Sequence, residues 1–126
     1  MLKDHDVGAV LPAEDLERAR HFYEETLGFE PESADPQGVM YRSGSSLFTV
    51  YPTQYSGLAQ HTQVGWLVED LRAMVTELRE RGIRFEEYDF PGLKTEDGIA
   101  DLQSELAAWF KDTEGNILGI FQRRRA

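Results

Sequence analysis

The chain has 126 residues, 40% of them hydrophobic, which suits a single folded domain with its own core and argues against disorder. Its 23 acidic and 13 basic residues give a net charge of −10, which disfavours nucleic acid as a partner and favours a cationic ligand at long range. Cysteine is absent, which excludes disulfides and thiol chemistry, and no apolar run suits a membrane span or signal peptide, so we expect a cytoplasmic protein without a membrane partner.

The first half of the chain predicts a strand, a helix and a β-hairpin. Residues 7–11 form a short apolar run typical of a buried strand. Apolar residues then recur at the spacing of one helix face: Leu16, Ala19, Tyr23 and Leu27. Gly28 follows as a helix terminator. Residues 39–42 and 47–51 flank a Ser-Gly-Ser turn and predict the hairpin.

The second half repeats this order. Residues 64–68 predict a strand, and a helix follows whose apolar face is formed by Leu71, Met74, Val75 and Leu78. Gly82 ends this helix, and residues 83–89 predict a further strand. Residues 107–112 and 117–121 flank the turn TEGN and predict a second hairpin.

The repeat predicts two β-α-β-β-β modules in a single domain of residues 1–126. The tripeptide EDL stands at 14–16 and again at 69–71, and we place the modules at about residues 5–55 and 61–122. Two such modules side by side would leave a curved inner face, the kind of concave surface that binds ligands. The second module has extra length at residues 88–105, which we predict to be a long loop over the mouth of that cleft, with Lys94 and Thr95 as polar contacts.

Three segments carry a resemblance to a known family: LPAEDLERARHFYEETLGFEP, VGWLVEDLRAMVTELRERGIRF and AWFKDTEGNILGIFQ. They resemble the vicinal oxygen chelate superfamily, which includes glyoxalase I, bleomycin-resistance proteins and extradiol dioxygenases. The resemblance implies an α+β fold in which two βαβββ modules pair to form a curved, cleft-bearing mixed sheet with helices on its outer face. It also implies a homodimer.

In catalytic members of that family, one metal ion is held by one residue from the first strand and one from the last strand of each module. Carried over by spacing, these positions are Gly8, Gln63, Phe48 and Gly119. Only Gln63 could coordinate a metal, and one neutral ligand cannot hold a divalent cation against water. We therefore predict that the usual metal site is absent and that there is no cofactor. The alternative is a divalent metal held by non-standard ligands, with Gln63 and His61 recruiting Asp6 or Glu86.

Strand alternation and the resemblance together predict the residues of the cleft. Trp109 stands where glyoxalase-like members place an aromatic pocket residue. Glycines would leave space and aromatic rings would form apolar walls for a planar ligand. The candidate ligand-binding residues are Met40, Phe48, His61, Gln63, Trp109, Gly119 and Phe121, with Tyr88, Phe90 and Lys94 from the long loop.

Three functions fit these features. We favour a metal-free binding protein, similar to antibiotic-resistance members of the family, that holds a small apolar or aromatic compound, cationic ones included. The second is a metal-dependent lyase or dioxygenase that uses non-standard ligands. The third is an interaction module without a small-molecule site, in which aromatic side chains fill the cleft.

Overall fold

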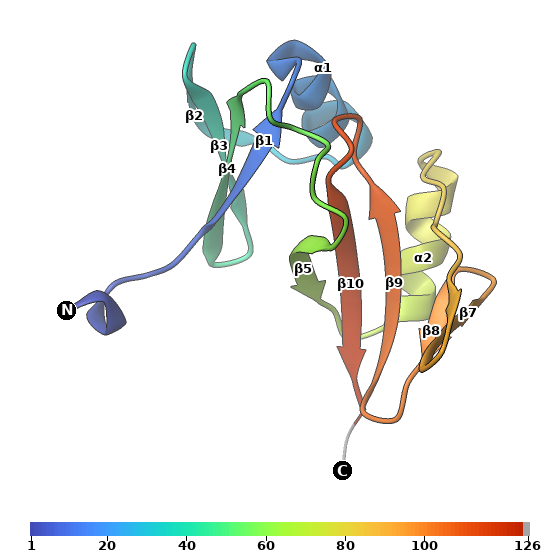
Figure 1. Ribbon diagram of the computed structural model, residues 1–126. Coiled ribbons are helices and arrows are strands. Elements are labelled where there is room, and N and C mark those ends of the chain that lie inside the picture. The colour runs from blue at the N-terminus through green and yellow to red at the C-terminus, as the bar shows by residue number, and fades with distance from the viewer. Residues whose placement is uncertain (125–126) are drawn as a thin grey trace.

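The computed structural model describes residues 1–124, which form two mixed β-sheets with helices behind them (Figure 1). Each sheet belongs to one half of the chain, and both helices lie on the same side of the sheets. The fold class predicted from the sequence, α+β with two βαβββ modules, is confirmed. A short 3₁₀ turn, η1 (Leu2–Asp4), precedes the first module on a segment that extends away from the body of the molecule.

The first module forms a four-stranded sheet in the order β1-β4-β3-β2. β1 and β4 run parallel, and the other neighbours are antiparallel. Its elements are β1 (Ala9–Ala13), α1 (Leu16–His21), the π-helical turn η2 (Phe22–Thr26), β2 (Pro31–Asp35), β3 (Gly38–Ser43) and β4 (Ser46–Pro52).

The second module repeats this arrangement and extends it to six strands, in the order β5-β10-β9-β8-β7-β6. β5 and β10 run parallel, as β1 and β4 do. Its elements are β5 (Thr62–Leu67), α2 (Leu71–Glu80), β6 (Asp89–Phe90), β7 (Leu93–Glu96), β8 (Ile99–Asp101), β9 (Glu105–Lys111) and β10 (Ile117–Arg123).

The two helices begin in the same way. Asp15 accepts a hydrogen bond from the backbone N–H of Arg18, and Asp70 accepts one from that of Ala73, so each aspartate caps the first turn of its helix. The repeated EDL sequence therefore marks two equivalent helix starts. Gly28 and Gly82 follow the helices with φ values of +84° and +91°, as predicted from their positions.

The main core lies between the helices and the two sheets and joins both modules. Tyr23 of η2 is fully buried, and its ring lies 5.8 Å from that of Tyr41 and 5.7 Å from that of Phe48. Trp66 of β5 stacks at 6.1 Å on Phe29, so aromatic contacts cross from one module to the other. A smaller apolar cluster lies on the opposite face of the second sheet and contains Trp109, Ala107 and Ala100.

Three expectations about chain organisation were wrong. The first strand begins at residue 9 rather than 7, and residues 83–89 form only an isolated bridge at Phe85 before β6. The predicted long loop at 88–105 is a run of short strands, β6 to β8, that widens the second sheet. The dipeptides Pro91-Gly92 and Asp97-Gly98 form the two-residue turns between these strands, and they are the features of the sequence that could have predicted the hairpins.

Candidate functional site

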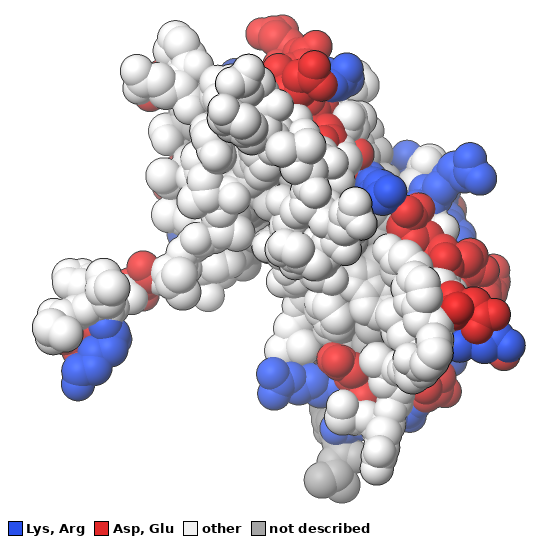
Figure 2. All heavy atoms as spheres, viewed as in Figure 1, with Lys and Arg blue, Asp and Glu red and all other residues white. Residues whose placement is uncertain are grey.

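The candidate site is a cleft on the face of the second sheet that looks away from the helices. Its volume is about 660 Å³, which is within the usual range for small-molecule sites. Figure 2 shows this side of the molecule: charged side chains are sparse over the sheets, and acidic ones gather near α1 and at the edge of the second module. The lining residues are Gly57, Ala59, Gln60, His61, Thr62, Glu86, Tyr88, Phe90, Leu93, Trp109, Lys111, Gly115 and Ile117.

Three aromatic rings form a continuous wall of this cleft. Tyr88 meets Trp109 edge to face at 5.5 Å and stacks on Phe90 at 5.6 Å with an interplanar angle of 24°. Trp109 is only 8% exposed, whereas Phe90 is 58% exposed and offers a free ring face. An exposed stacked ring next to a buried one can extend its stack onto a planar ligand.

The Trp109 ring is held in place by its own hydrogen bond. Its Nε1–H donates to the hydroxyl of Thr62 at 3.0 Å, which ties β9 to β5 across β10. The ring therefore cannot turn away without leaving a nearly buried N–H unpaired. The floor of the cleft is thus preformed, which reduces the entropy that ligand binding must overcome.

The polar groups of the cleft lie at its rim. Glu86 and Lys111 form an ion pair at 3.4 Å, with Glu86 the less exposed partner. Nδ1 of His61 lies 2.9 Å from the carbonyl oxygen of Thr62, so this nitrogen carries the proton and Nε2 is left for other contacts. The rim offers one cation, one anion and one imidazole around an aromatic wall.

The space above Gly119 is occupied by two side chains of the protein. Gly119 pairs with Gly65, and a Cβ added at Gly119 would lie 2.7 Å from Cζ of Phe121 and 3.2 Å from Cδ1 of Trp109. A Cβ added at Gly65 would lie 2.6 Å from Cε2 of Phe121. The Phe121 ring therefore covers both glycines, and this part of the expected cleft is filled.

The residues at the family's metal positions do not fit a metal ion. The side-chain oxygen of Gln63 accepts a hydrogen bond from the backbone N–H of Ile117 at 3.2 Å, where the β5–β10 register shifts. Gly8 and Gly119 offer no donor atom. Across residues 1–124, no group of three or more His, Cys, Asp or Glu side chains could hold a metal. The alternative set, Gln63 and His61 with Asp6 or Glu86, relies on an amide oxygen and stays a prediction from the sequence.

The placement of Phe48 in the cleft was wrong. Phe48 is 4% exposed, and its ring lies 5.2 Å from that of Phe29 in the main core. The first hairpin has a two-residue turn, whereas the second has a five-residue turn. Gly44 and Gly115 therefore do not hold equivalent places in their turns, and counting four residues from each gives positions that differ by one. The register makes Thr49 the residue of β4 that corresponds to Gly119.

Two further predicted residues lie away from the cleft. Lys94 of β7 lines a separate charged depression with Arg72, because alternation along the strand turns Leu93 rather than Lys94 towards the aromatic wall. Met40 is half-buried on β3 of the first module, on the face opposite its core neighbours Val39 and Tyr41. The cleft brings together four of the predicted residues: His61, Tyr88, Phe90 and Trp109.

Thr95 supports the wall without contacting the cleft. Its buried hydroxyl accepts a hydrogen bond from the backbone N–H of Tyr88 at 2.8 Å and donates to the carbonyl of Tyr88 at 3.3 Å. These bonds fix the backbone from which the Tyr88 ring projects. Sequence reasoning named Thr95 as a ligand contact, and its polar group is instead used inside the protein.

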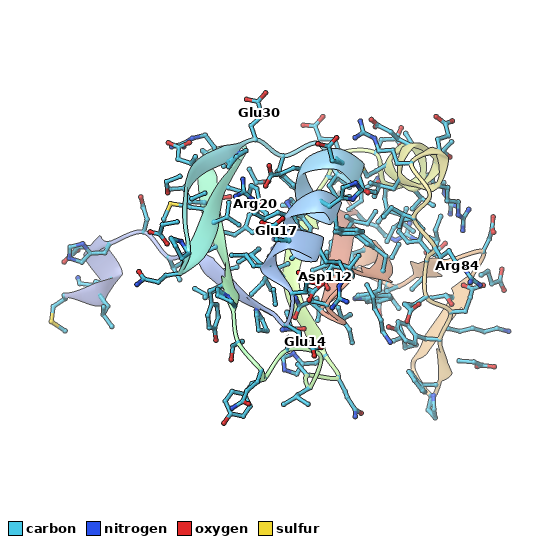
Figure 3. All side chains as sticks on the ribbon, turned by 90° about the horizontal axis from the view of Figure 1, so that it is seen from above. Glu14, Glu17, Arg20, Glu30, Arg84 and Asp112 are labelled. Atoms are coloured by element: carbon cyan, nitrogen blue, oxygen red, sulfur yellow. The ribbon has the colours of Figure 1, made fainter. Side chains whose placement is uncertain are left out.

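The turn that follows β9 joins the second module to α1 and η2 of the first module. Asp112, beside the start of α1 in Figure 3, accepts hydrogen bonds from the buried hydroxyl of Tyr23 at 2.6 Å and from the side chain of Asn116 at 2.7 Å. Burial, followed by the nearby Asp112 carboxylate, raises the pKa of Tyr23 well above its usual range. The Tyr23 hydroxyl therefore stays protonated and keeps donating to Asp112.

Glu114 of the same turn is the second link between the modules. Its carboxylate accepts from the backbone N–H of Asp15 at 2.9 Å and pairs with the guanidinium of Arg18 at 2.8 Å. Burial pushes the pKa of Glu114 up, but hydrogen bonds from Arg18, Asp15 and Thr113 outweigh it and leave the pKa below its usual value. These links anchor the second sheet, and with it the cleft, to the first module.

Sequence reasoning missed several lining residues. Glu86 was considered only as a metal ligand, and the segment Gly57 to Gln60 was not considered at all. Alternation from Trp109 along β9 places Lys111 on the same face, a signal that was available in the sequence. The contribution of residues 57–60 depends on how this connection packs against Gly115, and no local pattern predicts that contact.

Comparison with known proteins identifies the fold's relatives. The model of the Glyoxalase/Bleomycin resistance protein/Dioxygenase superfamily matches residues 7–120. No curated protein sequence matches the chain.

Solved structures show the same architecture at low sequence identity. A glyoxalase family protein from Enterococcus faecalis is 19% identical, with a TM-score of 0.72 over 96% of this chain and 99% of that one. A glyoxalase/bleomycin resistance protein/dioxygenase from Alicyclobacillus acidocaldarius is 18% identical, with a TM-score of 0.71 over 97% and 93%. TnmS3, an antibiotic binding protein from Streptomyces sp. CB03234, is 20% identical, with a TM-score of 0.62 over 95% and 96%.

Proposed function

The chain belongs to the Glyoxalase/Bleomycin resistance protein/Dioxygenase superfamily, and we propose that it binds a small planar aromatic compound in the cleft of its second module, without a metal. The observation that carries this proposal is the aromatic wall of Trp109, Tyr88 and Phe90. A ligand ring stacks on the free face of Phe90. Each such aromatic contact is worth about 0.5–1.5 kcal/mol beyond the area that it buries.

The rim selects the polar groups of the ligand. A cationic substituent pairs with Glu86 and an acidic one pairs with Lys111. In either case the ligand charge replaces one partner of the Glu86–Lys111 ion pair. The overall charge of −10 favours the cationic ligand at long range. The likeness to an antibiotic binding protein supports binding as the function.

The metal positions support binding over metal-dependent catalysis. Gly8 and Gly119 have no donor atoms, Thr49 offers a neutral hydroxyl, and the amide oxygen of Gln63 already accepts a backbone hydrogen bond. Oxygen-bound divalent cations need several ligands, carboxylates among them, and these four positions supply no carboxylate. We therefore propose that the protein works without a cofactor.

Thermal unfolding in the presence of planar aromatic compounds tests the proposed function. A ligand that binds the folded protein raises the melting temperature with concentration. The Phe90→Ala variant is expected to lose most of this shift. Tyr55→Ala serves as the matched control, because Tyr55 is an aromatic residue of similar exposure, 66% against 58% for Phe90, that does not line the cleft. Equal shifts in all three proteins would contradict the cleft as the site.

We also propose that the chain pairs with a second copy. Val10 and Leu67 are 61% and 67% exposed on the strand faces that look away from the main core, and Tyr51 is exposed on the same face of β4. Large apolar side chains that stay exposed on these strand faces can serve as an interface with a second copy. Light scattering is expected to give twice the 14.4 kDa mass, and Val10→Asp is expected to shift the protein towards the monomer.

The location of the protein in the cell stays a prediction from the sequence. Within the described part of the chain, no helix is long and apolar enough to cross a membrane.

A further inference from the structure

A second pocket opens on the helix side of the molecule, where the two modules meet. Its volume is about 170 Å³, and it shares no lining residue with the cleft described above. The first module contributes Leu27, Phe29 and Ser43. The second module contributes Trp66, Val68, Met74, Leu78, Phe110 and Ile120. We call it the inter-module pocket.

The lining of the inter-module pocket is almost entirely apolar. Eight of its nine residues are apolar, and the ninth, Ser43, accepts a hydrogen bond from Nε1–H of Trp66 at 2.9 Å. The Trp66 N–H is thus paired, and no charged side chain lines the space. A charged ligand would lose its hydration without compensation here, whereas an apolar one would lose nothing.

The walls of this pocket are held from both sides. The rings of Phe29 and Trp66 are stacked at 6.1 Å with an interplanar angle of 26°. Phe110 and Ile120 are 2% and 3% exposed and form the buried floor, while Phe29 and Trp66 are half-buried at the mouth. Arg81, which follows α2, links the two modules beside the pocket. Its Nη1 donates to the carbonyl oxygen of Thr26 at 3.3 Å, one residue before Leu27 of the pocket.

From this geometry we propose that the inter-module pocket binds an uncharged apolar molecule the size of one aromatic ring. An engineered apolar cavity of about 150 Å³ lined by Leu, Ile and Phe stays dry and takes up benzene or xenon. The inter-module pocket has a similar volume and a similar lining, and it has a mouth through which a ligand can enter. Because the ligand touches both modules, binding stabilises their docking.

The two tryptophans make this proposal testable, because each pocket has its own. In a Trp109→Phe protein, Trp66 is the remaining tryptophan and reports on the inter-module pocket alone. Bromobenzene, a single-ring apolar quencher, is titrated into this protein while the emission of Trp66 is followed. We expect quenching that saturates, together with a rise in melting temperature.

A variant with a filled pocket distinguishes binding from random collision. Val68→Phe, added to the Trp109→Phe protein, places a ring inside the pocket and is expected to raise the half-saturating concentration at least about tenfold. Val7→Phe is the matched control, because Val7 is 93% exposed and lies outside both pockets. Its titration curve is expected to equal that of the parent.

Folding of Val68→Phe is checked by circular dichroism. If Val68→Phe does not fold, Ser43→Leu is used as the second filling variant. Linear quenching without saturation in the Trp109→Phe protein overturns the proposal. So does a saturating curve that a folded filling variant leaves unchanged.

Discussion

At the level of single residues, Gly65 and Gly119 show how the protein fills part of its own cleft face. Both lie on the cleft face of neighbouring strands, and the ring of Phe121 lies over the pair. The sequence predicted that Gly119 would face the cleft and that a neighbouring aromatic side chain or a ligand would fill the space. The structure shows the aromatic side chain, which contacts Trp109 edge to face at 6.1 Å.

Adding one methyl group at Gly119 tests this packing. Gly119→Ala places a Cβ 2.7 Å from Phe121, and overpacking of this kind costs about 1–3 kcal/mol of folding free energy. In a Phe121→Leu background the same change is expected to cost less, because the ring that it would meet is gone. Denaturant unfolding of the four proteins gives the coupling between the two sites. Equal costs in both backgrounds would show that Phe121 does not occupy this space.

Glu114 gives the molecule a predicted sensitivity to acid. Its folded-state pKa lies below the usual value of 4.5, because the hydrogen bonds from Arg18, Asp15 and Thr113 outweigh the effect of burial. A lowered pKa means that the stabilisation is present above the unfolded-state value and is lost as pH falls through the folded-state value.

Replacing the carboxylate measures that contribution. Glu114→Gln is expected to be less stable than the parent at pH 7, and the difference is expected to shrink below about pH 4. Urea unfolding of both proteins across this range provides the measurement. Glu32→Gln is the control, because Glu32 also pairs with an arginine but on an exposed surface, where such pairs contribute little. A constant difference between Glu114→Gln and the parent at every pH would contradict the assigned role.

At the level of elements, the sequence predicted both helices and both long hairpins, because each depends on local signals. The apolar spacing of α1 and α2 and the glycines after them define these helices without reference to the rest of the fold. The face of Phe48 was mistaken because it depends on the length of a turn. Strands β6 to β8 were mistaken for a loop because their residues are mostly polar, although Asp97-Gly98, with φ values of +53° and +79°, is a typical hairpin turn.

The β6–β8 extension supports the aromatic wall, and Thr95 tests that role. Thr95→Val removes the hydroxyl that accepts from the N–H of Tyr88, which leaves this part-buried N–H unpaired at a cost of about 1–3 kcal/mol, whereas the carbonyl of Tyr88 keeps its bond from the backbone N–H of Thr95. We expect faster hydrogen exchange at the Tyr88 amide and weaker binding of aromatic ligands. Thr76→Val is the matched control, since its hydroxyl bonds an exposed carbonyl on α2. Unchanged hydrogen exchange at the Tyr88 amide would contradict the supporting role of Thr95.

At the level of the whole molecule, two similar modules have acquired different surfaces. The second module carries the aromatic cleft, whereas the equivalent face of the first module is an exposed apolar surface with Val10 and Tyr51. The turn at Asp112 and Glu114 and the Phe29–Trp66 stack hold the modules together. The sequence predicted the repeat and the family, but the pocket between the modules arises from packing across the repeat and has no local sequence signal.

The central claim is that the cleft of the second module binds a planar aromatic ligand through stacking and without a metal. A Trp66→Phe protein leaves Trp109 as its tryptophan, and the ligand found by thermal unfolding is titrated into it while the Trp109 emission is followed. We predict a saturable change with the same dissociation constant before and after treatment with a metal chelator, and a constant raised about tenfold by Phe90→Ala. Binding that the chelator abolishes, or that Phe90→Ala leaves unchanged, would contradict the claim.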